Sequence, residues 1–81
     1  MPRSKVAELV GLFLQNDPHL NLATIAAEHP ADLAAALQEI EPRQAWSVLK
    51  DAPRPRQADI FGYFDMRFQA RLAAIMPRAE L

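Results

Sequence analysis

The sequence predicts an all-α protein in which short helices stack into a superhelix. Breakers recur along residues 29–77, at Pro30, Pro42, the Pro53/Pro55 pair, Asp65 and Pro77. Between breakers, each segment places its larger side chains at the i, i+4 and i+7 positions of one helical face. The four stripes are Leu33/Leu37/Ile40, Ala45/Leu49/Ala52, Gln57/Phe61/Phe64 and Phe68/Leu72/Ile75. With two glycines in 81 residues and an apolar fraction of 51%, the composition suits closely packed short helices and argues against a sheet.

The spacing of the stripes sets the length of the repeat. Each copy begins about twelve residues after the previous one. That length holds a helix of about two and a half to three turns and the corner that follows it. A helix of that length is marginal in water by itself, so each must bury its stripe against its neighbours. Residues 30–77 are therefore expected to form a row of helical repeats that curves into a superhelix, whose hand the spacing leaves open.

A helical hairpin over residues 4–28 is expected ahead of the repeats. Ser4 can cap its first helix, because a serine oxygen accepts a hydrogen bond from a free backbone N–H at a helix start. The Asn-Asp-Pro segment at 16–18 ends that helix, since the residue before a proline is pushed out of the helical region. Asn21 is the expected cap of the second helix, which runs to Glu28. The apolar face of the first helix consists of Val6, Leu9, Val10, Phe13 and Leu14.

The first repeat opens with the sequence His-Pro-Ala-Asp. Pro30 suits the first position of a helix, where its missing N–H is no loss, and Asp32 falls in the first turn, where a carboxylate meets free amides. His29 is then expected to be a corner residue at the helix start. A ligand or acid–base role for His29 is the alternative, but the other histidine, His19, lies in a different turn.

Two residues in the middle repeats have individual interpretations. Trp46 is expected to be half-buried and to bridge to the next helix. Gly62 lies inside an aromatic cluster, where a helical glycine costs up to about 1 kcal/mol relative to alanine. Close approach of another helix, or a helix end near Tyr63, would explain this glycine.

The last repeat, residues 66–76, is followed by Arg-Ala-Glu-Leu, with Leu81 where a fifth stripe would begin. An array of helical repeats whose final stripe is uncovered needs a further element over it. We therefore expect a domain cut short, a homodimer or a helix swap.

Length and composition narrow the function classes. A chain of 81 residues without cysteine is predicted to be a single domain, 1–81, with neither disulfides nor thiolate metal sites. A net charge of −1 with both signs dispersed gives no electrostatic footprint for nucleic acid or for an anionic membrane. No stretch reaches the roughly twenty apolar residues that span a bilayer. A cytoplasmic protein without direct membrane insertion is expected.

Residue patterns typical of catalysis are missing from the sequence. There is no cysteine nucleophile, glycine-rich phosphate loop or paired-histidine metal motif, and neither Ser4 nor Ser47 lies in a nucleophile-elbow context. Glu39 and Glu41 are two residues apart and would point in different directions on a helix. The sequence therefore predicts that the protein is not an enzyme.

Several runs carry a resemblance to a known family. The run HPADLAAALQEI, followed by short helices at the same step and by IFGYFD and ARLAAIMPRAEL, resembles the cytosolic N-terminal domain of MgtE-type magnesium transporters. The similarity covers nearly the whole chain and implies a right-handed superhelix. A weaker resemblance, through Glu28-His29-Pro30, links the chain to the middle domain of the flagellar motor switch protein.

The MgtE resemblance implies a regulatory, magnesium-responsive module. In that family the N domain is joined to a tandem CBS domain and a transmembrane pore domain. Magnesium ions bridge acidic faces of the N and CBS domains and keep the pore shut, and loss of the ions lets the N domain swing away. The chain departs from the family pattern because it ends before the last helices of the usual N domain and carries neither a CBS nor a pore segment.

Magnesium prefers oxygen ligands, keeps several waters and is typically held by one or two carboxylates. Asp59 falls between the stripe members Gln57 and Phe61 and should point outward. Its position in the third repeat resembles the one at which family members carry an acid facing the CBS domain. Asp59 is therefore the predicted metal ligand, for a Mg²⁺ site completed by a partner's acids. All the candidate acids, which could instead simply solubilise a helical surface, are Glu39, Glu41, Asp51, Asp59 and Asp65.

Basic residues close to the candidate acids in the sequence could compete with a metal ion for the carboxylates. Lys50, Arg54 and Arg56 are close enough in sequence to pair with Asp51 and Asp59, and such pairs contribute under about 1 kcal/mol at an exposed site. They would compete with a metal ion for the carboxylates. Asp51 also lies near a helix C-terminus, where a carboxylate opposes the helix dipole at a cost of a few tenths of a kcal/mol.

The second functional hypothesis is a metal-independent protein–protein docking superhelix of the flagellar motor switch type. It would use the groove between helices and an uncovered terminal stripe around Phe68, Leu72 and Leu81. This hypothesis and the transporter hypothesis share the fold and differ in their dependence on magnesium.

Overall fold

The computed structural model describes residues 5–15 and 17–76, which form six helices and no strand. The predicted all-α fold is confirmed. Its short helices are 8 to 10 residues long, and Ser4, Pro77 and Leu81 lie outside the described residues. The helices are α1 (Lys5–Leu14), α2 (Pro18–Ala27), α3 (Pro30–Leu37), α4 (Pro42–Leu49), α5 (Arg54–Phe61) and α6 (Met66–Ile75).

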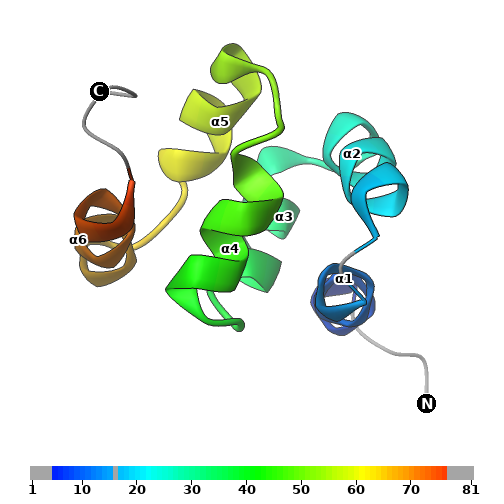
Figure 1. The fold of residues 1–81 in the computed structure, drawn as a ribbon, viewed down its shortest axis with the longest axis horizontal. Coiled ribbons are helices and arrows are strands. Elements are labelled where there is room, and N and C mark those ends of the chain that lie inside the picture. Colours follow the sequence, from blue (N-terminus) through cyan, green and yellow to red (C-terminus); the bar gives the residue numbers. More distant parts are fainter. Residues whose placement is uncertain (1–4, 16, 77–81) are drawn as a thin grey trace.

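The helices stack by skipping one position in the chain. α1 packs on α3 and α3 on α5, while α2 packs on α4 and α4 on α6. The two rows run along a body of 42 × 25 × 20 Å, with α1 and α6 at its opposite ends (Figure 1). Each helix therefore contacts helices that are distant in the sequence, which is how a stripe too small to form a core by itself becomes buried.

Proline lies in the first turn of four helices, α2 to α5, and the breakers Pro30, Pro42 and Pro53/Pro55 predicted the last three of these starts. Pro18, Pro30 and Pro42 each occupy a position in the first turn, where a missing N–H leaves no hydrogen bond unmade. At the third helix the residue before proline also acts as the cap, because His29 Nδ1 accepts a hydrogen bond of 3.0 Å from the Ala31 N–H. The predicted corner role of His29 is confirmed.

The predicted start of the second helix at Asn21 is wrong. Asp17 is the N-cap of α2, and its Oδ1 accepts a hydrogen bond of 2.9 Å from the His19 N–H. Helix α2 thus begins at the Asp17-Pro18 pair. Asn21 lies one turn inside α2 and is buried, at the same distance from the opening proline as Leu33 in α3.

The first two predicted stripes form the centre of the core. All six of their side chains are buried, and Leu33, Leu37 and Ala45 have no exposed area. On α1, Leu9 and Phe13 are buried. Leu12, and not the predicted Leu14, widens that face: Leu12 packs partly buried against the core, whereas Leu14 is exposed.

The third stripe differs from the prediction. Ile60 and Phe64 are buried, whereas Gln57 and Phe61 are partly exposed. Gln57 has another role: its Nε2 donates hydrogen bonds to the carbonyls of Lys50, at 3.1 Å, and Ala52, at 2.8 Å. The side chain therefore satisfies backbone oxygens left free where α4 ends.

The last stripe is covered at Phe68 and Leu72, whereas Ile75 is partly exposed. Phe68 is 6% exposed and Leu72 is fully buried, because α6 packs on α4, two helices earlier in the chain. The expectation of an open stripe on the final repeat was wrong because it assumed that each helix is covered by the next one in the sequence.

Polar side chains from one helix close the ends of another. On α5, Arg56 Nε donates a hydrogen bond of 2.9 Å to the carbonyl of Ile25, and its Nη2 donates to the carbonyl of Glu28. Both carbonyls lie at the C-terminal end of α2, where the helix dipole favours a positive charge. Gln69 Nε2 donates in the same manner to the carbonyl of Phe61, at 3.0 Å.

Gly62 is the C-cap of α5, so the helix end, and not close helix approach, accounts for this residue. A Cβ at Gly62 would lie 3.5 Å from the carbonyl oxygen of Ala58, an ordinary van der Waals distance. Its φ of −62° is open to any residue.

Asn21 is the weak point of the core. It is 6% exposed, and its Oδ1 has no hydrogen-bond partner among the described residues. A buried polar group without a partner costs about 1–3 kcal/mol. We expect Asn21→Leu to raise the free energy of unfolding by about 1 kcal/mol or more, measured by urea denaturation, because leucine has nearly the same size and supplies the stripe residue.

Ala23→Leu, at an exposed position of the same helix, is the matched control. It adds a leucine to α2 at little cost in helix propensity, and it should change stability by less than about 0.5 kcal/mol. A loss of stability in Asn21→Leu beyond that of the control would show that the amide makes a favourable interaction in the folded chain.

Candidate functional site

Two of the five candidate acids serve as helix caps. Asp65 is the N-cap of α6, where its Oδ1 accepts a hydrogen bond of 2.8 Å from the Phe68 N–H. Glu41 is the N-cap of α4 and forms a capping box with Gln44, whose Oε1 accepts from the Glu41 N–H at 3.3 Å. These carboxylates satisfy free backbone amides, so a structural role accounts for both.

Glu39 and Glu41 lie in a turn and not on one continuous helix. The interpretation that they point apart assumed a continuous helix, but both belong to the turn between α3, which ends at Leu37, and α4. Both line one hollow of about 320 Å³, and Arg71 of α6 lines it as well. A guanidinium in the same hollow favours pairing with the carboxylates over their sharing a metal ion.

Asp51 follows the C-terminus of α4 and is exposed. It lines a polar groove of about 240 Å³ between α2 and α4, together with Asn21, Ser47 and Lys50. The groove offers one carboxylate and one ammonium group, so its charge is balanced.

Asp59 lies on α5 and is exposed, as predicted. Its neighbour Ile60 is fully buried, so the two residues occupy different faces of the helix and Asp59 points outward. The predicted competition from Arg56 is wrong, because that guanidinium is engaged with the carbonyls of Ile25 and Glu28 on the other row of helices. Asp59 therefore presents its carboxylate to solvent on a helix fixed at both ends by other helices.

Within residues 5–15 and 17–76, no three acidic or histidine side chains gather where they could hold a metal ion. His29 uses its Nδ1 as a cap and lies edge-on to Tyr63, with ring centroids 5.9 Å apart. A cation at Asp59 would therefore need ligands from outside the described residues.

One ion pair lies at the opposite end of the stack from α6. Lys5 Nζ is 3.1 Å from Glu28 Oε1, and this hydrogen bond, together with the charge of Glu28, raises the pKa of Lys5 above its usual value. The pair ties α1 to the residue that follows α2 and is a feature of the fold.

Three side-chain caps at helix ends were not predicted from the sequence. Gln57 and Gln69 cap the end of the helix that precedes their own in the sequence, whereas Arg56 on α5 caps the end of α2 in the other row. The sequence has one regularity that could have indicated these caps: glutamine is the fourth residue of both α5 and α6.

Comparison with protein families decides the relationship. Residues 28–81, about two thirds of the chain, match the family model of the MgtE intracellular N domain. The chain belongs to the MgtE N-domain family. The match begins at Glu28, just before the first repeat, and takes in every repeat helix from α3 to α6. No curated protein and no solved structure matches the chain.

Membership of the MgtE N-domain family agrees with the predicted relationship and fold. It is a family of domains from transporters and not one of enzymes, and its description is that of an intracellular domain. None of the described helices is both long and apolar enough to cross a membrane.

Mutation can distinguish an acid that caps a helix, Asp65, from an acid that is exposed without a capping role, Asp59. Asp65→Ala removes the cap of α6 and should lower the free energy of unfolding by about 1 kcal/mol. Asp59→Ala, one helix earlier and without a capping role, should change it by less than about 0.5 kcal/mol. Urea denaturation of the two variants beside the parent chain measures both values. Equal losses would contradict the assignment of Asp65 to the fold and Asp59 to the surface.

Proposed function

We propose that this MgtE N domain regulates a magnesium transporter, with Asp59 supplying a carboxylate to a magnesium site shared with a CBS domain. The family match over residues 28–81 carries the proposal. The exposed position of Asp59 on α5 supports the choice of ligand. A cation of this kind is held by one or two carboxylates and several waters, so a single outward carboxylate is a suitable contribution from each domain.

The physical basis of regulation is charge repulsion. Two carboxylates about 4 Å apart repel by about 1 kcal/mol in water, and by about 4 kcal/mol where the effective dielectric constant is near 20. A divalent ion between them reverses the sign of this interaction. Domain association would then follow the magnesium concentration, and the coupling would act on a transmembrane pore domain in the same transporter.

The rigidity of the scaffold makes this switch effective. α5 is joined to α2 through Arg56, to the end of α4 through Gln57 and to α6 through Gln69. Asp59 therefore keeps its place relative to the rest of the domain when a partner approaches, and binding energy is not lost in ordering the helix.

The test is binding of this chain to the tandem CBS domain of an MgtE-type transporter, measured by titration calorimetry with millimolar MgCl₂ and with EDTA. We expect association only with magnesium. Asp59→Asn should weaken it about tenfold or more, which corresponds to about 1.4 kcal/mol, because a neutral amide neither repels the partner's acids nor attracts the ion.

Glu8→Gln, which removes an exposed charge on α1, is the control for a general loss of negative charge and should bind as the parent does. Equal affinity in magnesium and in EDTA would contradict the magnesium switch. An Asp59→Asn variant that binds like Glu8→Gln would leave the switch intact but remove Asp59 from it.

A further inference from the structure

The corner between α2 and α3 is closed by a group that titrates. Glu28 and His29 form this corner, and α3 begins at Pro30. His29 Nδ1 accepts the hydrogen bond of 3.0 Å from the Ala31 N–H. The usual caps are serine, threonine, asparagine and aspartate, and of these only aspartate titrates, well below neutral pH. A histidine cap differs from them because its acceptor is lost near neutral pH.

The capping bond exists in one charge state of the ring. A neutral imidazole has one nitrogen that accepts and one that donates, whereas both nitrogens of the imidazolium carry a proton and donate. Protonation of His29 therefore turns two donors, its Nδ1–H and the Ala31 N–H, toward each other. It also places a positive charge at the N-terminus of α3, where the helix dipole disfavours a cation. Both effects weaken the first turn of α3.

Contacts from two other helices meet at the same corner. Lys5 of α1 pairs with the carboxylate of Glu28. From the side of α5, Arg56 Nη2 donates to the carbonyl of Glu28, and the ring of Tyr63 lies edge-on to that of His29. α3 packs on both α1 and α5, so a change in its first turn reaches two neighbours.

The charges around the corner make an imidazolium unfavourable there. Arg56, held at the carbonyl of Glu28, repels a second cation, and the carboxylate of Glu28 already pairs with Lys5. Within residues 5–15 and 17–76, no carboxylate lies at ion-pair distance from the His29 ring. More distant acids attract it through water and offset only part of the loss. The charged and titratable groups on the elements around His29 are Lys5, Glu8, Asp17, His19, Glu28, Asp32, Arg54, Arg56, Asp59 and Tyr63.

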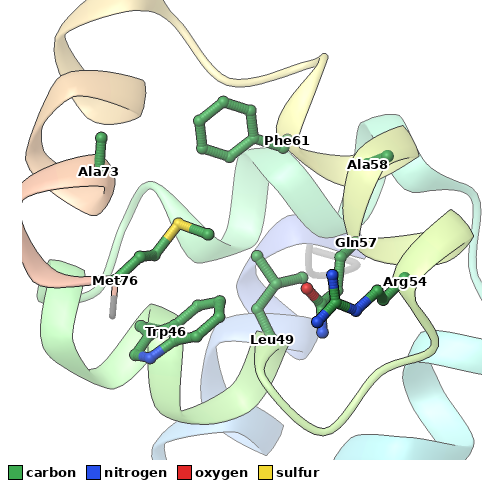
Figure 2. A pocket seen from close by; sticks show the side chains of 8 residues that line it. All are labelled: Trp46, Leu49, Arg54, Gln57, Ala58, Phe61, Ala73 and Met76. Atoms are coloured by element: carbon green, nitrogen blue, oxygen red, sulfur yellow. The ribbon is translucent and has the colours of Figure 1, made fainter. Parts of the chain in front are cut away.

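The single tryptophan of the chain lies away from this corner. Trp46 lines an apolar groove of about 340 Å³ between α4, α5 and α6, to which α5 contributes Gln57 and Phe61 (Figure 2). Arg56 and Tyr63, which contact the corner, do not line that groove. Trp46 emission therefore follows unfolding of the domain and is not quenched by contact with an imidazolium at the corner.

We propose that His29 is a pH-sensitive cap that loosens the domain in mild acid. The neutral ring closes the first turn of α3, whereas the imidazolium leaves that turn to fray. The same ring in the unfolded chain takes up a proton without losing a bond, so the unfolded state binds the proton more readily. Stability is therefore full above the pH range in which histidine titrates and falls as the pH decreases through that range. This device needs no magnesium and is independent of the proposed role of Asp59.

The test is urea denaturation at pH 7.5 and at pH 5.5, in EDTA, followed by Trp46 emission. Histidine ordinarily changes charge in this window, whereas carboxylates ordinarily stay ionised. We expect the unfolding equilibrium constant of the parent chain to be about fivefold larger at pH 5.5, the factor that corresponds to loss of a typical cap. His29→Asn supplies a cap that does not titrate, so its constant should change by less than about twofold. His19→Gln, which removes the other histidine at an exposed position of α2, is the control and should keep the fivefold change.

Hydrogen exchange of the Ala31 amide gives a local readout in the parent chain itself. Its protection, relative to an unstructured peptide at the same pH, should fall severalfold between pH 7.5 and pH 5.5. Equal stability of the parent chain at both pH values would overturn the proposal, as would equal losses in the parent and in His29→Asn. A loss that disappears in His19→Gln would also overturn it, because His19 would then be the sensitive ring. None of these outcomes affects the magnesium-dependent association.

Discussion

The fold depends on satisfying the backbone groups at the ends of very short helices. A helix leaves four N–H and four C=O groups without partners inside it, so a helix of eight residues lacks internal partners for about half of its backbone. In this MgtE N domain, prolines and caps occupy the starts, and side chains of other helices supply donors at the ends. Arg56 is the most extensive of these contacts because it joins α5 to two carbonyls at the end of α2.

The stacking order couples this constraint to the core. Because each helix packs on one two positions away, the apolar stripes of Leu33 and Leu37 are covered on several sides and become fully buried. The turns between successive helices bring Gln57 onto the end of α4 and Gln69 onto the end of α5. Apolar burial between helices two positions apart and polar capping between successive helices together hold Asp59 on a rigid frame.

Sequence reasoning predicted what depends on local chemistry. Proline positions and i, i+4, i+7 spacing predicted the four repeat helices, the first two stripes and the corner position of His29 at a helix start. It failed where a residue has two possible local roles or a distant partner. Asn21 resembles a cap in isolation, but the Asp17-Pro18 pair begins the helix first.

The contacts between helices could not be derived from the sequence. Gln57 fits an apolar stripe by position, yet its amide binds carbonyls at the end of another helix. Phe68 and Leu72 seemed uncovered because the prediction assumed packing between successive helices. The outward position of Asp59 followed from its place between stripe members, whereas the groove at Trp46 required three helices to be placed in space.

The most direct test of this account is the stability of Arg56→Met, measured by urea denaturation together with hydrogen exchange of the α2 amides. Arg67→Met, at an exposed position of α6, is the matched loss of a guanidinium. The account predicts that Arg56→Met loses about 2–3 kcal/mol, since hydrogen bonds to a charged group are removed and two carbonyls are left without donors, and that α2 loses protection first. Equal stability of the two variants, with α2 protected in both, would contradict it.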